Sequence, residues 1–336
     1  MSAAVEAGRR LASRRTAWRW LRPGVAVATL AVLVWRVGTG PFLDGLGRVD
    51  ARALAAATAI AVLTTVSCAW RWRTVARGLG VHLALGAAVT AYYRSLFLNV
   101  TLPGGVIGDV HRGISHGRDT SDVGRGLRAV AWERSAGQAV QVVLTVVVLL
   151  VAPSPVRGAM PLVALALLVA ATAVALVAFV RPAVRRSWWA RLHSRAARDL
   201  RAALLTRRAG PGIALASALV VAGHVATFFI AARTAGVTAP ASGLVPLALI
   251  VLAGAALPNL GGWGPREGVT AWAFAAAGLG ASLGVATAVV YGVMVFVASL
   301  PGAAVLVAAW VQRTQAVPGL TGGPGFPARR DGAPDG

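Results

Sequence analysis

The sequence predicts an all-α membrane protein whose chain crosses the bilayer several times. Hydrophobic residues make up 57% of its 336 residues, and the mean hydropathy is +0.69. Several apolar stretches approach or exceed the roughly 20 residues that a helix needs to cross a bilayer. Two breaks in the apolar pattern, both rich in proline and glycine, predict where the bundle departs from simple spanning helices.

The hydrophobic part of the chain falls into a series of apolar segments. In order, they are 23–41, 53–69, 82–102, 129–152, 159–180, 213–235, 244–257, 269–280 and 284–311. The segments 244–257 and 269–280 are too short to cross a hydrocarbon core of about 30 Å. Segment 82–102 ends directly on the first break, so it too is a candidate for partial insertion.

The two breaks resemble each other and lie one in each half of the chain. Residues 99–112 read NVTLPGGVIGDVHR, and residues 257–268 read LPNLGGWGPREG. Proline removes a backbone hydrogen-bond donor and glycine weakens a helix. Irregular backbone at membrane depth is tolerated only where protein or a wet cavity covers it. Interrupted segments in corresponding positions of two halves are typical of a transporter-like substrate site.

The chain is strongly basic. The formal net charge is +22, and all 33 basic residues other than histidine are arginine. A basic excess can indicate nucleic-acid binding. Here, however, the arginines flank apolar segments, as the positive-inside rule expects, and such loops attract anionic lipid headgroups. We therefore expect these basic loops to contact a lipid bilayer and the protein to bind no nucleic acid. Cys68 is the single cysteine, which excludes a disulfide framework within one chain.

Charge counting predicts the topology. The loop 181–212 holds nine arginines against one acid, so we place it in the cytoplasm. If segment 82–102 crossed fully, that loop would fall outside; we therefore expect 82–102 to enter and return to the cytoplasmic side. The loop 70–81 is then cytoplasmic. A second hairpin, 244–280, entering from outside, makes the C-terminus cytoplasmic. The prediction is about six full transmembrane helices plus two re-entrant hairpins in an inverted repeat.

The expected domain organisation follows from this scheme. Residues 1–22 form a basic cytoplasmic N-terminus, and residues 23–312 form the transmembrane domain with its basic cytoplasmic loop 181–212. Residues 313–336 are rich in glycine and proline and are expected to be disordered. Within the loop, 185–208 is either an interfacial amphipathic segment or a solvated one. We expect a multi-pass protein of a bacterial cytoplasmic membrane, with both termini cytoplasmic.

Charged residues within the apolar region gather on or beside the breaks. A charge at the bilayer centre costs about 3 kcal/mol, so such groups face the interior and pair. Helix ends at a break favour anions, and arginine adds bidentate phosphate recognition. The alternative is that these residues are structural ion pairs only. The candidate substrate-binding residues are Arg94, Asn99, Gly104, Gly105, Asp109, Arg112, Glu133, Arg134, Gly261, Gly262, Arg266 and Glu267.

Several catalytic patterns are missing from the sequence. It has no Gly-rich loop ending in Gly-Lys-Ser/Thr and no G-x-S-x-G elbow. His111 and His116 are five residues apart and do not match a zinc site. We therefore expect no cofactor, no metal and no catalytic residue in the chain.

The breaks resemble the signatures of the lysylphosphatidylglycerol synthase transmembrane family, whose members are flippase-like integral membrane proteins. The matching residues are Leu102, Pro103, Gly104, Gly105, Gly108, Asp109 and Arg112, then Glu133 and Arg134, then Pro258, Gly261, Gly262, Gly264, Arg266, Glu267 and Gly268. The resemblance covers roughly 23–311. It implies a domain that handles anionic, often lipid-linked, molecules. We expect the chain to lack the soluble aminoacyltransferase domain that full-length synthases carry.

The leading hypothesis is a flippase-like protein that binds and translocates an anionic phospholipid or a polyprenyl-phosphate-linked lipid. One alternative is a non-catalytic accessory subunit of a cell-envelope enzyme. Another is an integral membrane lipid transferase, for which Asp109 or Glu267 is the candidate base. The chain is thus more readily a transporter than an enzyme, and its expected partners are a lipid headgroup, the bilayer and a cell-envelope enzyme.

Overall fold

The described part of the chain is helical throughout and contains no strand. The structure is a computed structural model that describes residues 38–102, 105–179, 188–207, 209–255 and 263–315, together with Ala31 and Trp35. The helices are α2 (Gly40–Gly47), α3 (Ala51–Gly78), α4 (Leu85–Thr101), α5 (Ile107–Asp119), α6 (Val123–Val151), α7 (Met160–Phe179), α8 (Trp188–Ala203), α9 (Gly210–Thr234), α10 (Ala241–Gly254), α11 (Pro265–Ala276) and α12 (Ala281–Gln315), with a short 3₁₀ turn at Arg157–Ala159.

Four of these helices, α3, α6, α9 and α12, are long and apolar enough to cross a membrane. This confirms the predicted class, an all-α polytopic membrane protein. The first predicted segment, 23–41, lies mostly outside the described residues, as do the N-terminal 1–22 and the tail after residue 315. Helix α12 runs to Gln315, three residues into the predicted tail.

Several helices begin with a capping side chain or a proline. The Asp50 carboxylate accepts a hydrogen bond from the backbone N–H of Ala53 at 2.7 Å and caps α3. Asp122 caps α6 through the N–H of Arg125 at 2.8 Å. Such caps satisfy backbone donors that the first turn of a helix leaves unpaired. Helices α9 and α11 instead begin with a proline in their first turn, where its missing N–H costs nothing.

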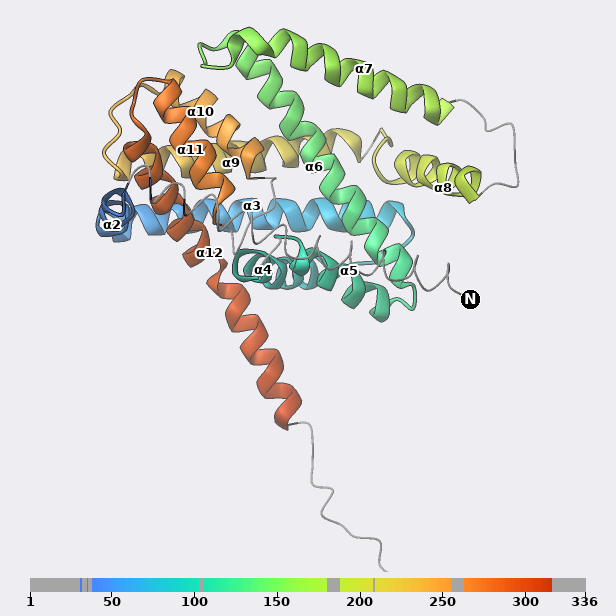
Figure 1. Cartoon of the computed structure of the whole chain (residues 1–336). Coiled ribbons are helices and arrows are strands. Elements are labelled where there is room, and N and C mark those ends of the chain that lie inside the picture. The colour runs from blue at the N-terminus through green and yellow to red at the C-terminus, as the bar shows by residue number, and fades with distance from the viewer. Residues whose placement is uncertain are drawn as a thin grey trace, which may run out of the picture.

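At one end of the bundle, helix α8 lies beside the C-terminal end of α3 and the N-terminal ends of α6 and α9. Gly78 packs against the backbone of Ala203, and Arg128 forms a 3.0 Å ion pair with Asp199 of α8. At the opposite end, Gly45 of α2 packs against the backbone of Ala286 in α12. In Figure 1, α2 and α8 accordingly lie on opposite sides of the molecule.

Helices α4 and α5 form one hairpin, and α10 and α11 form another. Helix α4 begins shortly after α3 ends, and α5 ends shortly before α6 begins, so the first hairpin opens at the α8 end. Helix α10 follows the end of α9, and α11 precedes the start of α12 beside α2, so the second opens at the α2 end. The two hairpins therefore enter the bundle from opposite ends (Figure 1).

Helix α12 packs against both hairpins, and a glycine of α12 lies at each of these close contacts. Gly292 lies against the Arg266 side chain at the start of α11, and a Cβ at Gly302 would collide with the Tyr93 carbonyl of α4. Within the first hairpin, a Cβ at Gly108 would collide with the backbone of Ser95. Small residues allow helices to approach closely in a membrane, and a single glycine has this role at each of these three contacts.

Candidate functional site

Asp109 is the centre of a polar network between the two helices of the first hairpin and α6. Its carboxylate accepts hydrogen bonds from Ser95 at 3.1 Å and Asn99 at 2.9 Å, both on α4. It also accepts from Arg112 Nε at 3.1 Å and from Arg134 on α6. Four donors therefore surround one carboxylate that is only 5% exposed.

Glu133 is the second centre of the same network and is fully buried. Its Oε1 accepts from Arg71 Nε of α3 at 2.9 Å and from the Tyr92 hydroxyl at 3.3 Å. Its Oε2 accepts from Arg112 Nη2 at 2.7 Å. The remaining arm of Arg71 donates to Ser217 Oγ of α9 at 2.9 Å. The network therefore connects α3, α4, α5, α6 and α9.

The local sequence explains how these side chains meet. Asp109 and Arg112 are three residues apart on α5, a spacing that places them on one helix face. Asn99 holds Asp109 and also accepts from the N–H of Gly108 at 2.8 Å, so its amide fixes the start of α5 against α4. Gly137 makes room for the guanidinium of Arg71, since a Cβ there would lie 2.8 Å from Arg71 Nη2.

Aromatic rings enclose the arginine that both carboxylates share. The guanidinium carbon of Arg112 lies 4.2 Å from the Tyr92 ring centroid and 4.7 Å from that of Trp72. Cation–π contact is strongest where water is excluded, and the Arg112 side chain has no exposed surface. Its Nη1 nevertheless has no hydrogen-bond partner.

Charge is balanced inside the network and positive at its rim. The buried groups Arg71, Arg112, Asp109 and Glu133 sum to zero. Arg134 adds one positive charge, and its side chain is 42% exposed. Buried charges are tolerated when they are paired, and the charges of the four buried groups compensate one another. The surplus positive charge is therefore placed where a molecule from outside the network can reach it.

A smaller cluster forms at the second hairpin. The backbone N–H of Gly264 donates to Glu267 Oε2 at 2.7 Å, so Glu267 caps α11 with its own side chain. The other oxygen of Glu267 accepts from Arg266 Nε at 2.9 Å. The Arg266 guanidinium lies 5.5 Å from the ring centroids of both Trp263 and Tyr291. This pair is electrically neutral, in contrast to the network at the first hairpin.

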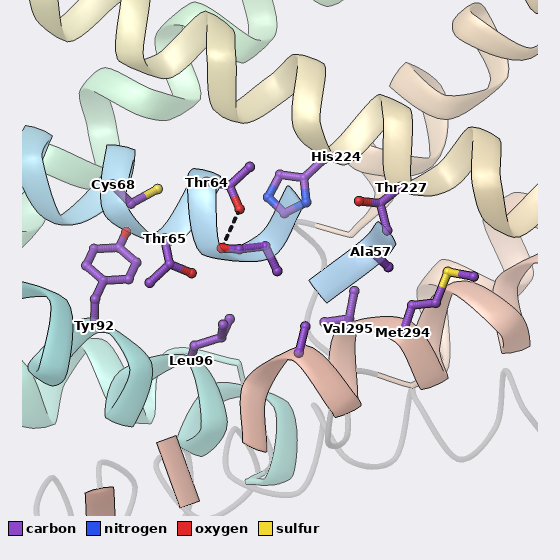
Figure 2. Close-up of a pocket in the computed structure, with 12 residues that line it drawn as sticks. Ala57, Thr64, Thr65, Cys68, Tyr92, Leu96, His224, Thr227, Met294 and Val295 are labelled. Atoms are coloured by element: carbon purple, nitrogen blue, oxygen red, sulfur yellow. Dashed lines mark hydrogen bonds between the residues drawn. The ribbon is translucent and has the colours of Figure 1, made fainter. Parts of the chain in front are cut away.

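A cavity of about 90 Å³ lies between these clusters, bounded by α3, α4, α9 and α12. Figure 2 shows Cys68 and Tyr92 at one end and His224 and Thr227 at the other. Tyr92 donates to Glu133 on its far side. His224 Nδ1 lies 3.3 Å from the Tyr291 hydroxyl, whose ring faces Arg266. The cavity therefore has one charged cluster behind each end.

The structure divides the predicted site residues into these two clusters. Asn99, Asp109, Arg112, Glu133 and Arg134 lie in the network of the first hairpin, and Arg266 and Glu267 lie at the second. The expected single site lined by arginines from both breaks is thus two clusters on either side of the cavity.

The remaining predicted site residues add little to the description of the two clusters. Gly105 precedes α5 with a positive φ of 65°, a conformation that glycine adopts without strain. Arg94 is partly buried on α4, and its neighbour Ser95 is the residue that reaches Asp109. Gly104, Gly261 and Gly262 lie outside the described residues.

Sequence reasoning missed Arg71 as a site residue, and the expectation that residues 70–78 form a loop after segment 53–69 was wrong. Helix α3 continues to Gly78, and Arg71 is 5% exposed within it. The apolar stretch ends at residue 69 because arginines follow, but a paired arginine does not end a helix. Its partner Ser217 carries no sequence signal, because a lone serine in an apolar span fits ordinary packing equally well.

These features define a polytopic helical membrane protein with two opposed hairpins, each carrying a buried charged cluster beside a central cavity. The chain matches the family described as "Lysylphosphatidylglycerol synthase TM region" over residues 19–302. It belongs to this family, as the signatures at the two breaks predict. No curated protein and no solved structure matches the chain.

The network predicts a large cost for removing its central carboxylate. Glu133→Gln should leave Arg71 without a buried counter-charge and Arg112 with Asp109 as its remaining carboxylate partner. Breaking a buried pair in this way costs about 3–5 kcal/mol. We expect a clearly lower midpoint of thermal unfolding in detergent micelles. Arg125→Gln is the control, because it breaks an exposed ion pair on the same helix that is worth less than about 1 kcal/mol. Equal midpoints for the two variants would contradict the network's structural role.

Proposed function

We propose that the chain binds an anionic phospholipid or polyprenyl-phosphate-linked lipid and moves it across the membrane, with the phosphate held at Arg134. The observation that carries this proposal is the charge distribution of the network. Its buried groups are neutral as a set, and its surplus positive charge is on the half-exposed side chain of Arg134. An anion at this point neutralises that charge.

Arg134 has hydrogen-bonding capacity to spare. Its Nη2 donates to Asp109, while its Nε is buried and has no hydrogen-bond partner. A guanidinium presents five N–H donors in a planar fork that suits two phosphate oxygens. Asp109 is itself held by Ser95, Asn99 and Arg112, so it fixes the orientation of Arg134 while part of the fork remains available.

The hairpin arrangement supports movement across the bilayer. We propose that α4–α5 and α10–α11 are re-entrant hairpins that enter from opposite membrane faces, in a scheme of six spans with both termini in the cytoplasm of a bacterial cell. The support is that their open ends lie at opposite ends of the bundle, at α8 and at α2. Inverted repeats around a central site are typical of alternating access.

A transferase role receives less support from the geometry. Such a reaction needs a carboxylate base with a free oxygen near the substrate. Asp109 already accepts from four side chains, and Glu267 is engaged by Arg266 and by the N–H of Gly264. Both carboxylates are therefore committed to holding structure, which favours binding over chemistry.

Transport in reconstituted vesicles tests this function. Arg134→Gln should abolish or strongly reduce the translocation of a labelled anionic phospholipid, because it removes the surplus charge. Arg128→Gln is a matched control: Arg128 also lies on α6, its side chain is also 42% exposed, and it also pairs with an aspartate. Similar transport by both variants and the wild type would contradict the proposed site. Failure of the wild-type protein to transport, together with a copurifying enzyme, would favour the accessory-subunit alternative.

Thiol labelling tests the proposed topology. In a Cys68→Ala background, Ser242→Cys at the start of α10 should react with a membrane-impermeant reagent added to intact cells. Thr120→Cys at the end of α5 should react only after the cells are opened. Both positions are exposed in the structure, so burial does not explain a difference. Labelling of both from outside would contradict hairpins that enter from opposite faces.

A further inference from the structure

His224 is an ionisable residue for which neither the fold nor the proposed phosphate site gives a role. It lies near the middle of α9, a helix long and apolar enough to cross a membrane, and its ring lines the central cavity (Figure 2). Ionisable side chains at this depth are costly, face the protein interior and mark ion pathways or proton relays. Histidine is also the side chain whose charge ordinarily changes between about pH 5 and 8.

A tyrosine on a neighbouring helix holds the His224 ring. His224 Nδ1 lies 3.3 Å from the Tyr291 hydroxyl of α12, and this is the one hydrogen-bond partner that the described residues give the ring. A hydroxyl both donates and accepts, so it can bond the neutral imidazole and the imidazolium alike. Both nitrogens of an imidazolium donate. In that form Nδ1 stays bound to the Tyr291 oxygen, and the Nε2 N–H is available to an acceptor in the cavity.

Within the described part of the chain, no carboxylate contacts the His224 ring. Helix α10 carries no titratable residue, and α6 carries none after Arg134. Helix α9 itself has Arg233 at its far end, bonded to the carbonyls of Val237 and Ala239. The titratable or charged groups towards His224 on the other elements are Cys68 and Arg71 of α3, Tyr92 of α4, Tyr291 of α12, and Arg266 and Glu267 of α11.

A proton on His224 supplies a charge that the cavity otherwise lacks. The other side chains that line the cavity are apolar or are uncharged at neutral pH. The arginines behind its two ends are already matched, Arg71 by Glu133 and Arg266 by Glu267. An anion that leaves Arg134 for the second hairpin therefore meets no available positive charge on the way unless His224 is protonated. An unpaired charge at this depth is costly, and an imidazolium beside the anion offsets that cost.

We propose that His224 is a proton-binding site and that the chain moves one proton together with each anion, as an electroneutral cotransporter. The inference rests on the proposed function, in which Arg134 receives the anion. A proton from the acidic side of the membrane adds to the ring nitrogen that lacks one, and the imidazolium pairs with the anion. Proton and anion then leave together on the alkaline side, which restores the neutral ring. A pH gradient is therefore the energy source and sets the direction of transport.

The leaflet distribution of a labelled lipid in vesicles that contain the intact protein tests the inference. The probe is a trace of phosphatidylglycerol with a fluorescent acyl chain, whose phosphodiester keeps one negative charge near neutral pH. A membrane-impermeant quencher reports the fraction in the outer leaflet. With the lumen more alkaline, we expect accumulation in the inner leaflet, by up to about tenfold per pH unit for one proton per anion. A potassium diffusion potential without a pH gradient should leave the distribution unchanged, because proton and anion together carry no net charge.

His224→Gln should abolish the accumulation that the pH gradient drives. Glutamine can still bond the Tyr291 hydroxyl, but it binds no proton in this pH range. His82→Gln is the matched control, because His82 is exposed between α3 and α4 and does not line the cavity; it should accumulate the label as the wild type does. Accumulation by His224→Gln that equals that of the wild type would overturn the inference, as would an equal loss in both variants.

The wild-type protein alone can overturn the inference, so the test does not depend on the folding of a variant. A label that redistributes with the membrane potential but not with the pH gradient would mean that the anion moves without a proton. If the wild type equilibrates the label, Arg134→Gln slows this and the gradient causes no accumulation, the phosphate site stands and proton coupling is overturned. If the wild type moves the label no faster than protein-free vesicles do, the proposed function is overturned and the inference falls with it.

Discussion

The rest of the structure depends on the double ion pair in which Glu133 binds Arg71 of α3 with one oxygen and Arg112 of α5 with the other. A carboxylate and two guanidinium groups in this setting are stable only together, because each alone would be an uncompensated buried charge. Asp109 supplies the second negative charge and ties α4 to the same point through Ser95 and Asn99. These ion pairs and hydrogen bonds therefore fix the position of the first hairpin, together with the apolar packing of α4 residues such as Ala88 against α3 and α6.

This constraint explains why some arginines stabilise the fold while another is available to a ligand. Arg71 and Arg112 are enclosed and matched by carboxylates, so they serve the fold. Arg134 also pairs with Asp109, but its side chain remains 42% exposed. It can therefore bind a ligand without breaking the buried ion pairs. The second hairpin has a simpler arrangement, in which Glu267 caps its own helix and neutralises Arg266. Each hairpin carries a charged cluster, but the surplus charge lies beside the first hairpin, on Arg134 of α6.

Much of this could be predicted from the sequence, and the exceptions have physical reasons. The length and apolar composition of the segments predicted long spanning helices, and ion pairing of residues such as Asp109 and Arg112 was the structural alternative to a substrate site. Glu133 and Arg134 were both expected in the substrate-binding site, but neighbouring residues on a helix point in different directions, and each bonds a different partner. Arg71 was missed because hydropathy cannot distinguish an arginine that ends a span from one that is paired within it. The cavity could not be predicted, since it depends on how α3, α4, α9 and α12 pack.

The central claim is that a neutral buried network presents one available arginine to a lipid phosphate. It is tested most directly by an experimental structure of the protein in a bilayer that contains phosphatidylglycerol. The account predicts phosphate oxygens at about 2.8 Å from nitrogen atoms of Arg134, with Glu133 still bound to Arg71 and Arg112. Ordered lipid only on the outer surface, with no phosphate at Arg134, would contradict it.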